Sequence, residues 1–468
     1  MSCAINPVTG KREFVLMSET QEIEIGRQMD PKIIKEYGLY PDEALQEYVN
    51  QVGQKLAAIC DRPDLHYRFK LVNSPIVNAF ALPGGYVYVT RGLLAYINNE
   101  AELAGVIGHE IGHITSRHAV RQYTKAQTYQ LGILAASIFY PEISQLGQFA
   151  DFLALAIIQG YGRNYELQAD RLGVKYSSSV KYDPHCVSSF MKTLKNIEEA
   201  TGQKGYHGLF SSHPETEERI LKAEEEAKKV TTPPSDPFKR PREKYLTKID
   251  GLAFGSDPKE GVVIRNVFRH PDLRIELTFP EDWTINNGKE VLAAKHPEKK
   301  YFIQMTLSVL GKKLSPAELA KKVEKNYHLN KLSGFPQIIN GLSAYVGTYE
   351  GRKREMGEIK AEVASILVED KGYIVMGFSP SFSFKEAMPF FTSTINSFKR
   401  LSFKEAKRIK PHKIRIHTVK ESDTWENIAL ACGQQPGEAK TLALINALDP
   451  ENSPQPGTKI KVICAEGN

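Results

Sequence analysis

Residues 109–113 read His-Glu-Ile-Gly-His, a spacing that predicts a metal site together with its catalytic carboxylate. Residues four apart on a helix lie on the same face, so the imidazoles of His109 and His113 can bind one cation. Glu110 projects beside them, where its carboxylate can hold a water molecule rather than the cation. Zinc in such a site lowers the pKa of its water towards neutrality, and Glu110 is placed to accept the proton that this water loses.

The residues before this motif predict the helix that the geometry needs. Asn99 is an expected N-cap, and Glu102 is expected to complete a capping box with it. Apolar residues then follow at helical spacing, namely Leu103, Val106 and Ile107. A longer zincin signature continues with glycine and histidine where this chain has Ser116 and Ala119. The third ligand must therefore come from another segment.

A second helical segment, residues 164–170, offers this ligand. Glu166 and Asp170 lie four residues apart and therefore on one helix face. Glu166 can complete a site of two histidines and one glutamate, and Asp170 can accept the free ring N–H of a ligating histidine and so fix its tautomer. The alternative is that both carboxylates decorate a solvated helix face.

Further motifs flank this pair. The sequence Asn-Ala-Phe-Ala stands at 78–81, and Ser-His-Pro at 212–214 is followed by Arg219. In this order the motifs resemble the HtpX-like and CAAX-prenyl-protease-like zinc metallopeptidases, in particular the soluble members of the bacterial envelope. The resemblance covers roughly residues 10–230. It implies a mainly α-helical, zincin-type domain of the gluzincin kind, with a small β-sheet and one zinc ion.

The resemblance also implies the roles of the site residues. It assigns the zinc ligands to His109, His113 and Glu166. It makes Glu110 the catalytic carboxylate and places His213 and Arg219 near the active site. There, either residue assists the oxyanion of the reaction, or His213 takes the open position of the metal in a resting state. His-Pro followed by arginine at a helix start is also common as a structural feature, so the residues alone leave both interpretations open.

Residues 76–89 predict a β-hairpin beside the metal. An apolar run, the turn Leu-Pro-Gly-Gly at 82–85 and a second apolar run follow one another. If one strand is an open sheet edge, a peptide can add to it at Asn78, Ala79 and Phe80 and bind through backbone hydrogen bonds, which favours unfolded chains. The alternative is an ordinary buried hairpin.

Length and composition bound the architecture. A chain of 468 residues is too long for a single core and suggests about three domains. The formal net charge of +6 is spread along the chain, without the basic and aromatic cluster typical of nucleic-acid binding. Two apolar stretches, 131–140 and 152–158, are far shorter than the roughly twenty residues that span a bilayer. They are expected to form a helical hairpin over the active site.

The expected domain boundaries follow from changes in composition. The zinc metallopeptidase domain is expected at 1–230, because a linker rich in threonine and proline follows it. Residues 245–403 combine short apolar strands with one charged helix at 315–327, which predicts an α+β domain. Its Phe-Pro-Glu-Asp-Trp step at 279–283 and a closing helix at 390–398 resemble PsbP proteins. No chemistry is assigned to this domain.

Residues 412–468 resemble a LysM module, a small strand, helix, helix, strand fold. The resemblance rests on His-Thr-Val at 417–419, on Asp-Thr-Trp-Glu-Asn-Ile-Ala at 423–429 and on Gln-Pro-Gly-Thr at 455–458. It implies binding to N-acetylglucosamine polymers such as peptidoglycan, which would tether the peptidase to the cell wall. Ser422 stands where such modules usually have glycine, and a merely structural cap is the alternative.

The five cysteines are odd in number and widely scattered, so they define neither a disulfide framework nor a zinc cluster. Cys432 and Cys464 can pair within the tail. Cys3, after Met-Ser, resembles the first residue of mature envelope lipoproteins and implies a lipid anchor there. This favours the periplasmic side of the bacterial envelope over the cytoplasm, where Cys3 would be incidental.

The sequence therefore predicts a multidomain zinc endopeptidase that hydrolyses unfolded or misassembled envelope proteins. One alternative is a catalytically silent adaptor that binds peptidoglycan, and another is a peptidoglycan amidase that uses the same metal. Intact Glu110 beside intact ligands favours the endopeptidase.

Overall fold

The computed structural model describes residues 2–133, 160–201, 213, 217–231, 241–255, 260–288, 291–309, 314–434 and 436–465. It divides into two compact units, unit one with Met1–Gly255 and His412–Asn468, and unit two with Ser256–Pro411. The first and third of the expected segments therefore pack into the same unit. The helical hairpin expected from 131–140 and 152–158 lies outside the described residues, apart from 131–133 at the end of a helix.

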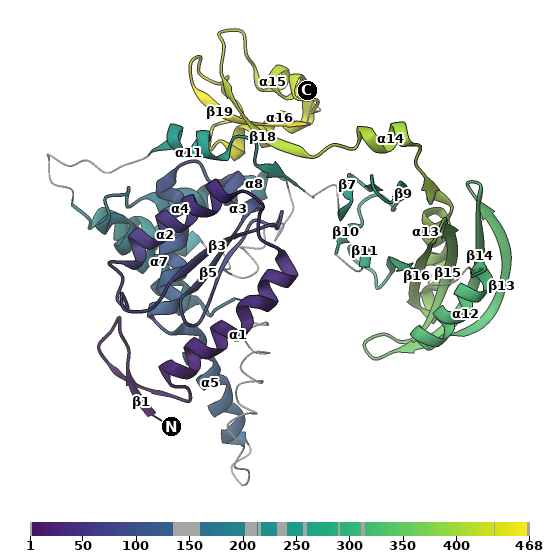
Figure 1. Ribbon diagram of the computed structural model, residues 1–468, viewed down its shortest axis with the longest axis horizontal. Helices are drawn as coiled ribbons and strands as arrows, with labels where there is room; N and C mark the ends of the chain where they lie inside the picture. The colour runs from purple at the N-terminus through teal and green to yellow at the C-terminus, as the bar shows by residue number, and fades with distance from the viewer. Residues whose placement is uncertain are drawn as a thin grey trace. The chain divides into compact units, whose positions relative to one another are not determined.

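Unit one is mainly helical (Figure 1). Its elements before residue 256 are β1 (Ser2–Ile5), β2 (Arg12–Val15), α1 (Glu19–Tyr37), α2 (Glu43–Ala57), β3 (Arg68–Val72), β4 (Ala79–Leu82), β5 (Tyr86–Thr90), α3 (Arg91–Tyr96), α4 (Glu100–Thr115), α5 (His118–Ile133), α7 (Arg163–Ser179), α8 (Cys186–Thr201), α10 (Glu217–Lys228), α11 (Arg242–Ile249) and β6 (Ala253–Phe254). No described helix is both long enough and apolar enough to cross a membrane.

A small sheet with strand order β3-β5-β4 lies against α4. The hairpin expected at 76–89 is present as antiparallel β4 and β5, and β3 runs parallel to β5. Its turn uses Gly84 and Gly85, whose φ angles of 82° and 93° suit glycine. Strand β4 is one of the two outer strands of this described sheet, so one side of its backbone is not paired with another strand of the sheet.

Helix α4 carries the His-Glu-Ile-Gly-His motif through the centre of unit one. Every residue from Glu100 to Thr115 is buried, because α2, α7, α8 and β4 pack around the helix. Asn99 is its N-cap, as predicted, and accepts a hydrogen bond from the Glu102 N–H. The expected capping box is wrong, since the Glu102 carboxylate accepts instead from the backbone N–H of Asn98, one residue earlier.

Glycines let α7 approach α4 closely. A Cβ atom on Gly108 would lie 3.2 Å from the Cα of Gly173, and one on Gly112 would lie 3.3 Å from the Cα of Ala169. Larger side chains at these positions would push the helices apart. The close approach brings the Glu166 end of α7 against the histidine motif on α4.

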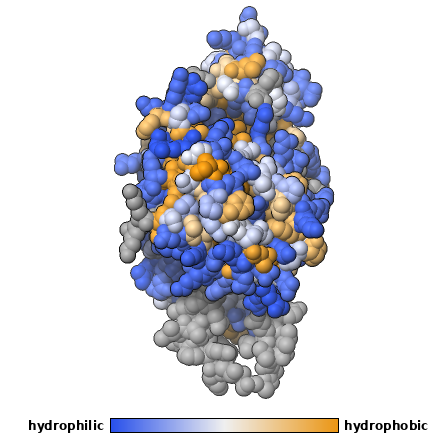
Figure 2. Space-filling model, turned by 90° about the vertical axis from the view of Figure 1, so that its right-hand side faces the viewer, coloured by the Kyte–Doolittle hydropathy of each residue, from blue (hydrophilic) through white to orange (hydrophobic). Residues whose placement is uncertain are grey.

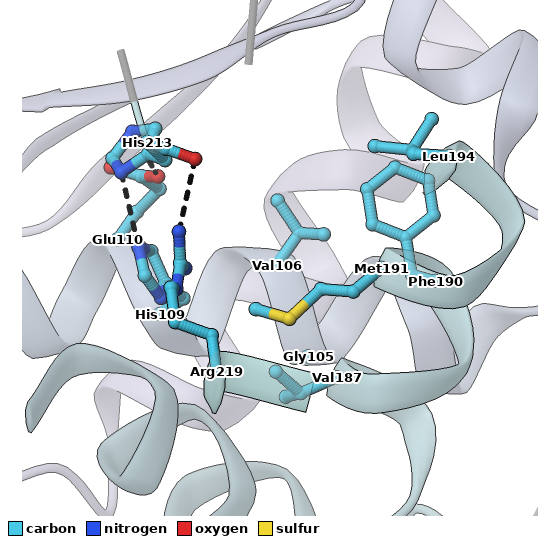
Figure 3. Close-up of a pocket in the computed structure, with 10 residues that line it drawn as sticks. All are labelled: Gly105, Val106, His109, Glu110, Val187, Phe190, Met191, Leu194, His213 and Arg219. Carbon is cyan, nitrogen blue, oxygen red and sulfur yellow. Dashed lines mark hydrogen bonds and ion pairs between the residues drawn. The ribbon is translucent and has the colours of Figure 1, made fainter. Parts of the chain in front are cut away.

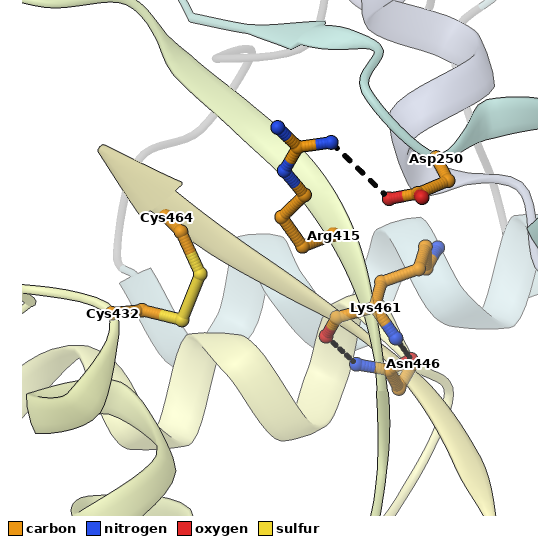
Figure 4. Close-up of a disulfide and its surroundings, with 6 residues drawn as sticks. All are labelled: Asp250, Arg415, Cys432, Asn446, Lys461 and Cys464. Atoms are coloured by element: carbon orange, nitrogen blue, oxygen red, sulfur yellow. Dashed lines mark hydrogen bonds and ion pairs between the residues drawn. A yellow bond between two sulfur atoms is a disulfide. The ribbon is translucent and has the colours of Figure 1, made fainter. Parts of the chain in front are cut away.

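The tail contains β18 (His412–Thr418), α15 (Trp425–Ala431), α16 (Ala439–Ile445) and β19 (Lys459–Ala465), so it has the expected order of strand, helix, helix and strand. Strands β18 and β19 are antiparallel, and β6 pairs with β18. A disulfide joins Cys432 to Cys464 (Figure 4). The buried apolar side chains of the tail belong to the same core cluster as those of α4 and α8.

Unit two is an α+β unit dominated by a seven-stranded antiparallel sheet of order β10-β11-β12-β16-β15-β14-β13. Its strands are β10 (Thr284–Asn287), β11 (Val291–Lys295), β12 (Phe302–Val309), β13 (Asn330–Ile339), β14 (Leu342–Lys353), β15 (Gly357–Val368) and β16 (Lys371–Pro380). The main helices are α12 (Pro316–Tyr327), close to the predicted helix, and α13 (Phe384–Ser397), which begins six residues before the predicted one.

The second sheet of this unit has four strands, in the order β17-β9-β8-β7. They are β7 (Val262–Ile264), β8 (Val267–His270), β9 (Ile275–Thr278) and β17 (Lys399–Arg400). The face shown in Figure 2 is largely hydrophilic, with hydrophobic areas between the hydrophilic ones. The outer strand β13 leaves three apolar side chains exposed, namely Leu332, Phe335 and Ile338. No site residue was expected here.

Candidate metal centre

Four buried side chains from three segments of unit one converge on one point. The ligand atoms of this cluster all lie within 4.8 Å of one another, and they belong to His109, His113, Glu166 and His213. Nε2 of His109 lies 3.0 Å from Nε2 of His113 and 3.5 Å from Oε2 of Glu166. Nε2 of His113 lies 3.5 Å from Oε1 of Glu166. The structure thus brings together the three residues expected as ligands.

The spacing of these atoms fits a zinc ion. Zinc bonds of about 2.0–2.2 Å in a tetrahedral arrangement place ligand atoms on the order of 3.3 Å apart. The chemistry fits as well. Nδ1 of His109 faces the Asp170 carboxylate at 2.8 Å and carries a proton towards it. In the neutral ring Nε2 can turn a lone pair towards the other ligand atoms, where a metal cation can take the place of a second ring proton.

Asp170 joins His109 to Arg219. The Arg219 guanidinium donates two hydrogen bonds of 2.8 Å to the Asp170 carboxylate and a third of 3.0 Å to the carbonyl of His213. Its Nη1 also lies 3.1 Å from Oε2 of Glu166. Although burial opposes the change, the positive charge of Arg219 lowers the pKa of Asp170. Arg219 therefore keeps Asp170 ionised and ties the segment at 213 to α7.

The two acidic side chains nearest the ligands have opposite pKa shifts. Burial opposes ionisation of Glu166, but His213 and then His109 hold its pKa well below the ordinary range. Burial raises the pKa of Glu110, and neighbouring cationic groups only partly offset this rise. Without metal, Asp170 and Glu166 raise the pKa of His109 to about 10 against the effect of burial. Glu166 is therefore an anion, and Glu110 is a carboxylate that holds a proton more readily than usual.

Glu110 lies on α4 beside the ligands, with 1% of its surface exposed. Its Oε1 has no hydrogen-bond partner among the described residues. Nε2 of His213 is 3.5 Å from this oxygen, beyond a good hydrogen bond. A buried carboxylate oxygen in this state is suited to a small polar molecule such as water.

His213 faces the other three members of the cluster. Its Nδ1 lies 3.2 Å from Nε2 of His109 and 3.0 Å from Oε2 of Glu166. The ring therefore lies between the ligand atoms and Glu110. Figure 3 shows His213 above His109 and Glu110, with Arg219 bound to its carbonyl.

His118 is not among the site residues expected from the sequence, yet it contacts His113. In a straight helix, five positions rotate a side chain roughly 140° away from the starting face. Arg117 interrupts the helix with a φ of 54°, and His118 returns with its Nδ1 2.9 Å from Nδ1 of His113. Its Nε2 lies 3.1 Å from Oε1 of Gln168. Nothing in the sequence marked a left-handed arginine.

Tyr161 was also missed. Its ring stacks on that of His113, with centroids 4.3 Å apart. The contact restricts the orientation of the His113 imidazole, and the hydrogen bond between His113 and His118 restricts it further.

The residues expected to bind substrate lie at the outer strand of the small sheet. The Asn78 backbone holds this strand to β5, because its N–H donates to Oγ1 of Thr90 and its carbonyl accepts from the Thr90 N–H. Ala79 and Phe80 are buried, and the Phe80 ring stacks on Tyr88 at 4.9 Å. Ala79 exposes 0% and Phe80 3% of its surface, so their side chains belong to the core and hardly any of their backbone reaches the surface.

An apolar pocket opens beside Glu110 (Figure 3). Side chains of α8 form much of its wall, namely Val187, Phe190, Met191 and Leu194. Gly105 and Val106 of α4 line it as well, and one end is formed by His109, Glu110, His213 and Arg219. An apolar side chain held here lies next to the candidate catalytic carboxylate.

The comparisons with known proteins agree with this geometry. Residues 43–227 match the model of peptidase family M48. Over 230 residues the chain is 31% identical to the mitochondrial metalloendopeptidase OMA1 of Schizosaccharomyces pombe. The aligned segment makes up 47% of this chain and 65% of that protein. Over 232 residues the chain is 28% identical to the beta-barrel assembly-enhancing protease of Escherichia coli. The aligned segment makes up 48% of this chain and 47% of that protein.

The chain thus spans about half to just under two thirds of the length of these relatives. Among solved structures, the solution structure of cyanobacterial PsbP from Synechocystis is similar to part of this chain. The superposition covers 30% of this chain and 95% of the PsbP chain, with 14% sequence identity and a TM-score of 0.24. A likeness at this TM-score supports no conclusion. Residues 43–227 are thus similar to peptidase family M48, and the clustered histidines and glutamate lie within the matched stretch.

Proposed function

We propose that the protein is a zinc-dependent endopeptidase. The observation that carries the proposal is the convergence of His109, His113 and Glu166 beside a buried Glu110 whose Oε1 lacks a hydrogen-bond partner among the described residues. Two imidazoles and one carboxylate are the ligands of a catalytic zinc site with a place left for water. Nitrogen and oxygen ligands also accept cobalt or nickel, so zinc is part of the proposal.

When bound, zinc supplies an acidified water and polarises the peptide carbonyl. Glu110 accepts the proton of the attacking water and later gives it to the leaving amine, so one carboxylate acts as base and then as acid. Burial raises the pKa of Glu110, which makes its carboxylate a stronger base towards the attacking water. Asp170 holds His109 in the tautomer that offers Nε2.

His213 is proposed to take the fourth position in the resting enzyme. Its Nδ1 lies within 3.2 Å of ligand atoms from two other residues, as a fourth donor would. A substrate that enters must then displace this ring. Arg219 keeps the segment near the site through the carbonyl of His213 and faces Glu166, where its charge can assist an oxyanion.

The proposed substrates are unfolded or misassembled proteins. An extended chain can add to the outer edge of β4 at Asn78, Ala79 and Phe80 through backbone hydrogen bonds, which folded proteins do not offer. The apolar pocket beside Glu110 supports the same class, since unfolded chains expose apolar side chains. The assignment to the bacterial envelope extends the similarity to the beta-barrel assembly-enhancing protease.

The tail is proposed to be a LysM-like module at residues 412–468 that binds peptidoglycan, after a peptidase domain at 1–230 and an α+β domain at 245–403. The order of its elements supports the module, and its disulfide supports a place in the periplasm, where disulfides persist. A lipid anchor at Cys3 belongs to the same proposal.

The test compares the full chain with Glu110→Gln. We expect both proteins to bind one zinc ion and only the unsubstituted chain to cleave casein. Glu355→Gln, in an exposed turn of unit two, is the matched control and should leave cleavage unchanged. Zinc binding without cleavage of any protein would indicate the adaptor, and release of stem peptides from purified cell wall would indicate the amidase.

A further inference from the structure

The last turn of α3 and the two residues after it receive hydrogen bonds from residues beyond the peptidase family match. Together they form the connection at 94–98, which leads through the N-cap Asn99 into the helix with the His-Glu-Ile-Gly-His motif. Four of its carbonyls accept from side chains that follow residue 227. Leu94 accepts from Tyr245 at 2.5 Å, Ala95 and Ile97 accept from Lys461 at 2.9 Å each, and Asn98 accepts from Arg242 at 3.2 Å.

Lys461 contributes two of these four bonds from the last described strand of the chain. Its relative exposure is 0%, and burial lowers its pKa well below the ordinary value. Burying an amine costs free energy unless its N–H groups find partners. Here two N–H groups reach carbonyls at the C-terminal end of α3, where carbonyl oxygens lack partners within the helix.

Asn446 fixes Lys461 within the tail. The Lys461 N–H donates to Oδ1 of Asn446 at 2.8 Å, and Nδ2 of Asn446 donates to the Lys461 carbonyl at 2.8 Å (Figure 4). The same Oδ1 accepts from Arg242 at 3.3 Å. The side chain of Lys461 therefore extends from a strand that the tail holds on both sides.

The connection held in this way determines where α4 begins. The Asn98 N–H donates to Glu102 in the first turn of the helix, at 2.8 Å, and Ser189 of α8 donates to the same carboxylate at 2.6 Å. Helix α4 is buried along its whole length, so the elements packed around it leave little room for local bending. A displacement of residues 95–98 would therefore have to be accommodated along the helix, towards His109 and Glu110.

We propose that Lys461 is a positioning residue of the peptidase, which fixes the connection at 94–98 and thereby the placement of the metal-ligand helix. The module at 412–468 is then a working part of the catalytic unit and not only a tether. The effect on turnover rests on the proposed function, whereas the effects on the backbone of the connection and on metal binding do not.

The experiment uses the full chain and two substitutions that each remove donors to the connection. Lys461→Met replaces the side chain by an unbranched apolar one that is one atom shorter and has no N–H groups. Tyr245→Phe removes only the hydroxyl that reaches Leu94. The matched control is Lys459→Met on the same strand, because this lysine pairs with Glu243. Hydrogen exchange of residues 94–104, zinc affinity and the kcat and KM of casein cleavage are measured.

In Lys461→Met we expect exchange at 94–104 to rise and zinc affinity to fall by roughly tenfold, the scale of losing hydrogen bonds from a buried polar group. We also expect kcat to fall while KM changes little. Tyr245→Phe should give a smaller change of the same kind, and Lys459→Met none. Unchanged exchange and zinc affinity in both variants would overturn the proposal.

Should Lys461→Met fail to fold, Tyr245→Phe decides on its own, since phenylalanine keeps the ring in the core. A protein without casein cleavage but with the expected exchange and zinc changes would contradict the endopeptidase and leave the positioning role intact. Normal cleavage in all variants, with unchanged exchange and zinc affinity, would support the endopeptidase and contradict the positioning role.

Discussion

The carboxylate of Asp170 lies 2.8 Å from Nδ1 of His109 and receives the guanidinium of Arg219 on its other side. One buried acid thus sets the proton position on a candidate ligand and is itself kept ionised. A histidine that offers Nε2 to a metal needs its other nitrogen engaged in this way.

Replacing Asp170 by asparagine should weaken zinc binding by about 10- to 100-fold, the range seen when the partner of a ligating histidine is lost. The amide keeps the size of the side chain but not its charge, so both the tautomer of His109 and the position of Arg219 become less defined. A competition titration with a zinc chelator measures the change. Asp423→Asn in the tail is the control, and equal affinities in both variants would contradict the assigned role.

Zinc should stabilise unit one and leave unit two unaffected. At a free zinc concentration about a hundred times the Kd, linkage predicts a gain of about 2.7 kcal/mol in the free energy of unfolding. Calorimetry with and without a chelator measures it, and His109→Ala should remove the response. If zinc still raised the unfolding temperatures of both units in His109→Ala, zinc would bind at another site.

The disulfide between Cys432 and Cys464 should stabilise the tail by roughly 3–4 kcal/mol, because it closes a loop between residues 32 apart in sequence. Cys432→Ser with Cys464→Ser should lower the denaturant midpoint of unit one by the corresponding amount. A reducing agent should do the same to the unsubstituted chain and nothing further to the double variant. A reductant effect of equal size in both proteins would exclude this bond as the cause.

Stability should also depend on pH through Glu224, which joins α10 to α8. Partial burial opposes its ionisation, but hydrogen bonds from Lys192 and Ser188 lower its pKa from 4.5 to about 2. A lowered pKa in the folded state stabilises the fold above pH 4.5, and this contribution is lost as the pH falls from 4.5 towards 2.

Glu224→Gln should therefore be less stable than the unsubstituted chain at neutral pH, with the difference shrinking below pH 4.5. Urea unfolding at a series of pH values measures it, with Glu355→Gln as the control. A difference that stays constant from neutral pH to pH 2 would show that the carboxylate acts through packing alone.

Local sequence patterns predicted the parts of the site that depend on one helix at a time. The spacing of His109 and His113, and of Glu166 and Asp170, follows directly from the helical repeat. How closely these two helices meet depends on Gly108, Gly112 and Gly173, which fit together only once both helices are in place. A single sequence does not show which glycines face one another.

Two contacts of the site had no local signal. His118 reaches His113 because Arg117 adopts a left-handed conformation that arginine rarely takes. Lys461 reaches Ile97 across a sequence separation of 364 residues. The resemblance to a LysM module marked the tail as a separate segment, and nothing in its sequence indicated that a lysine of its last strand would be buried against the connection at 94–98.

That separation has a consequence for protein synthesis. A ribosome that adds about 5–20 residues per second needs roughly 20–70 s to proceed from Ile97 to Lys461. During this time the nascent chain already carries the histidine motif but lacks the two N–H donors that hold the start of its helix. On the proposed role of Lys461, the candidate metal centre is therefore fully ordered only after the distal strand has been translated.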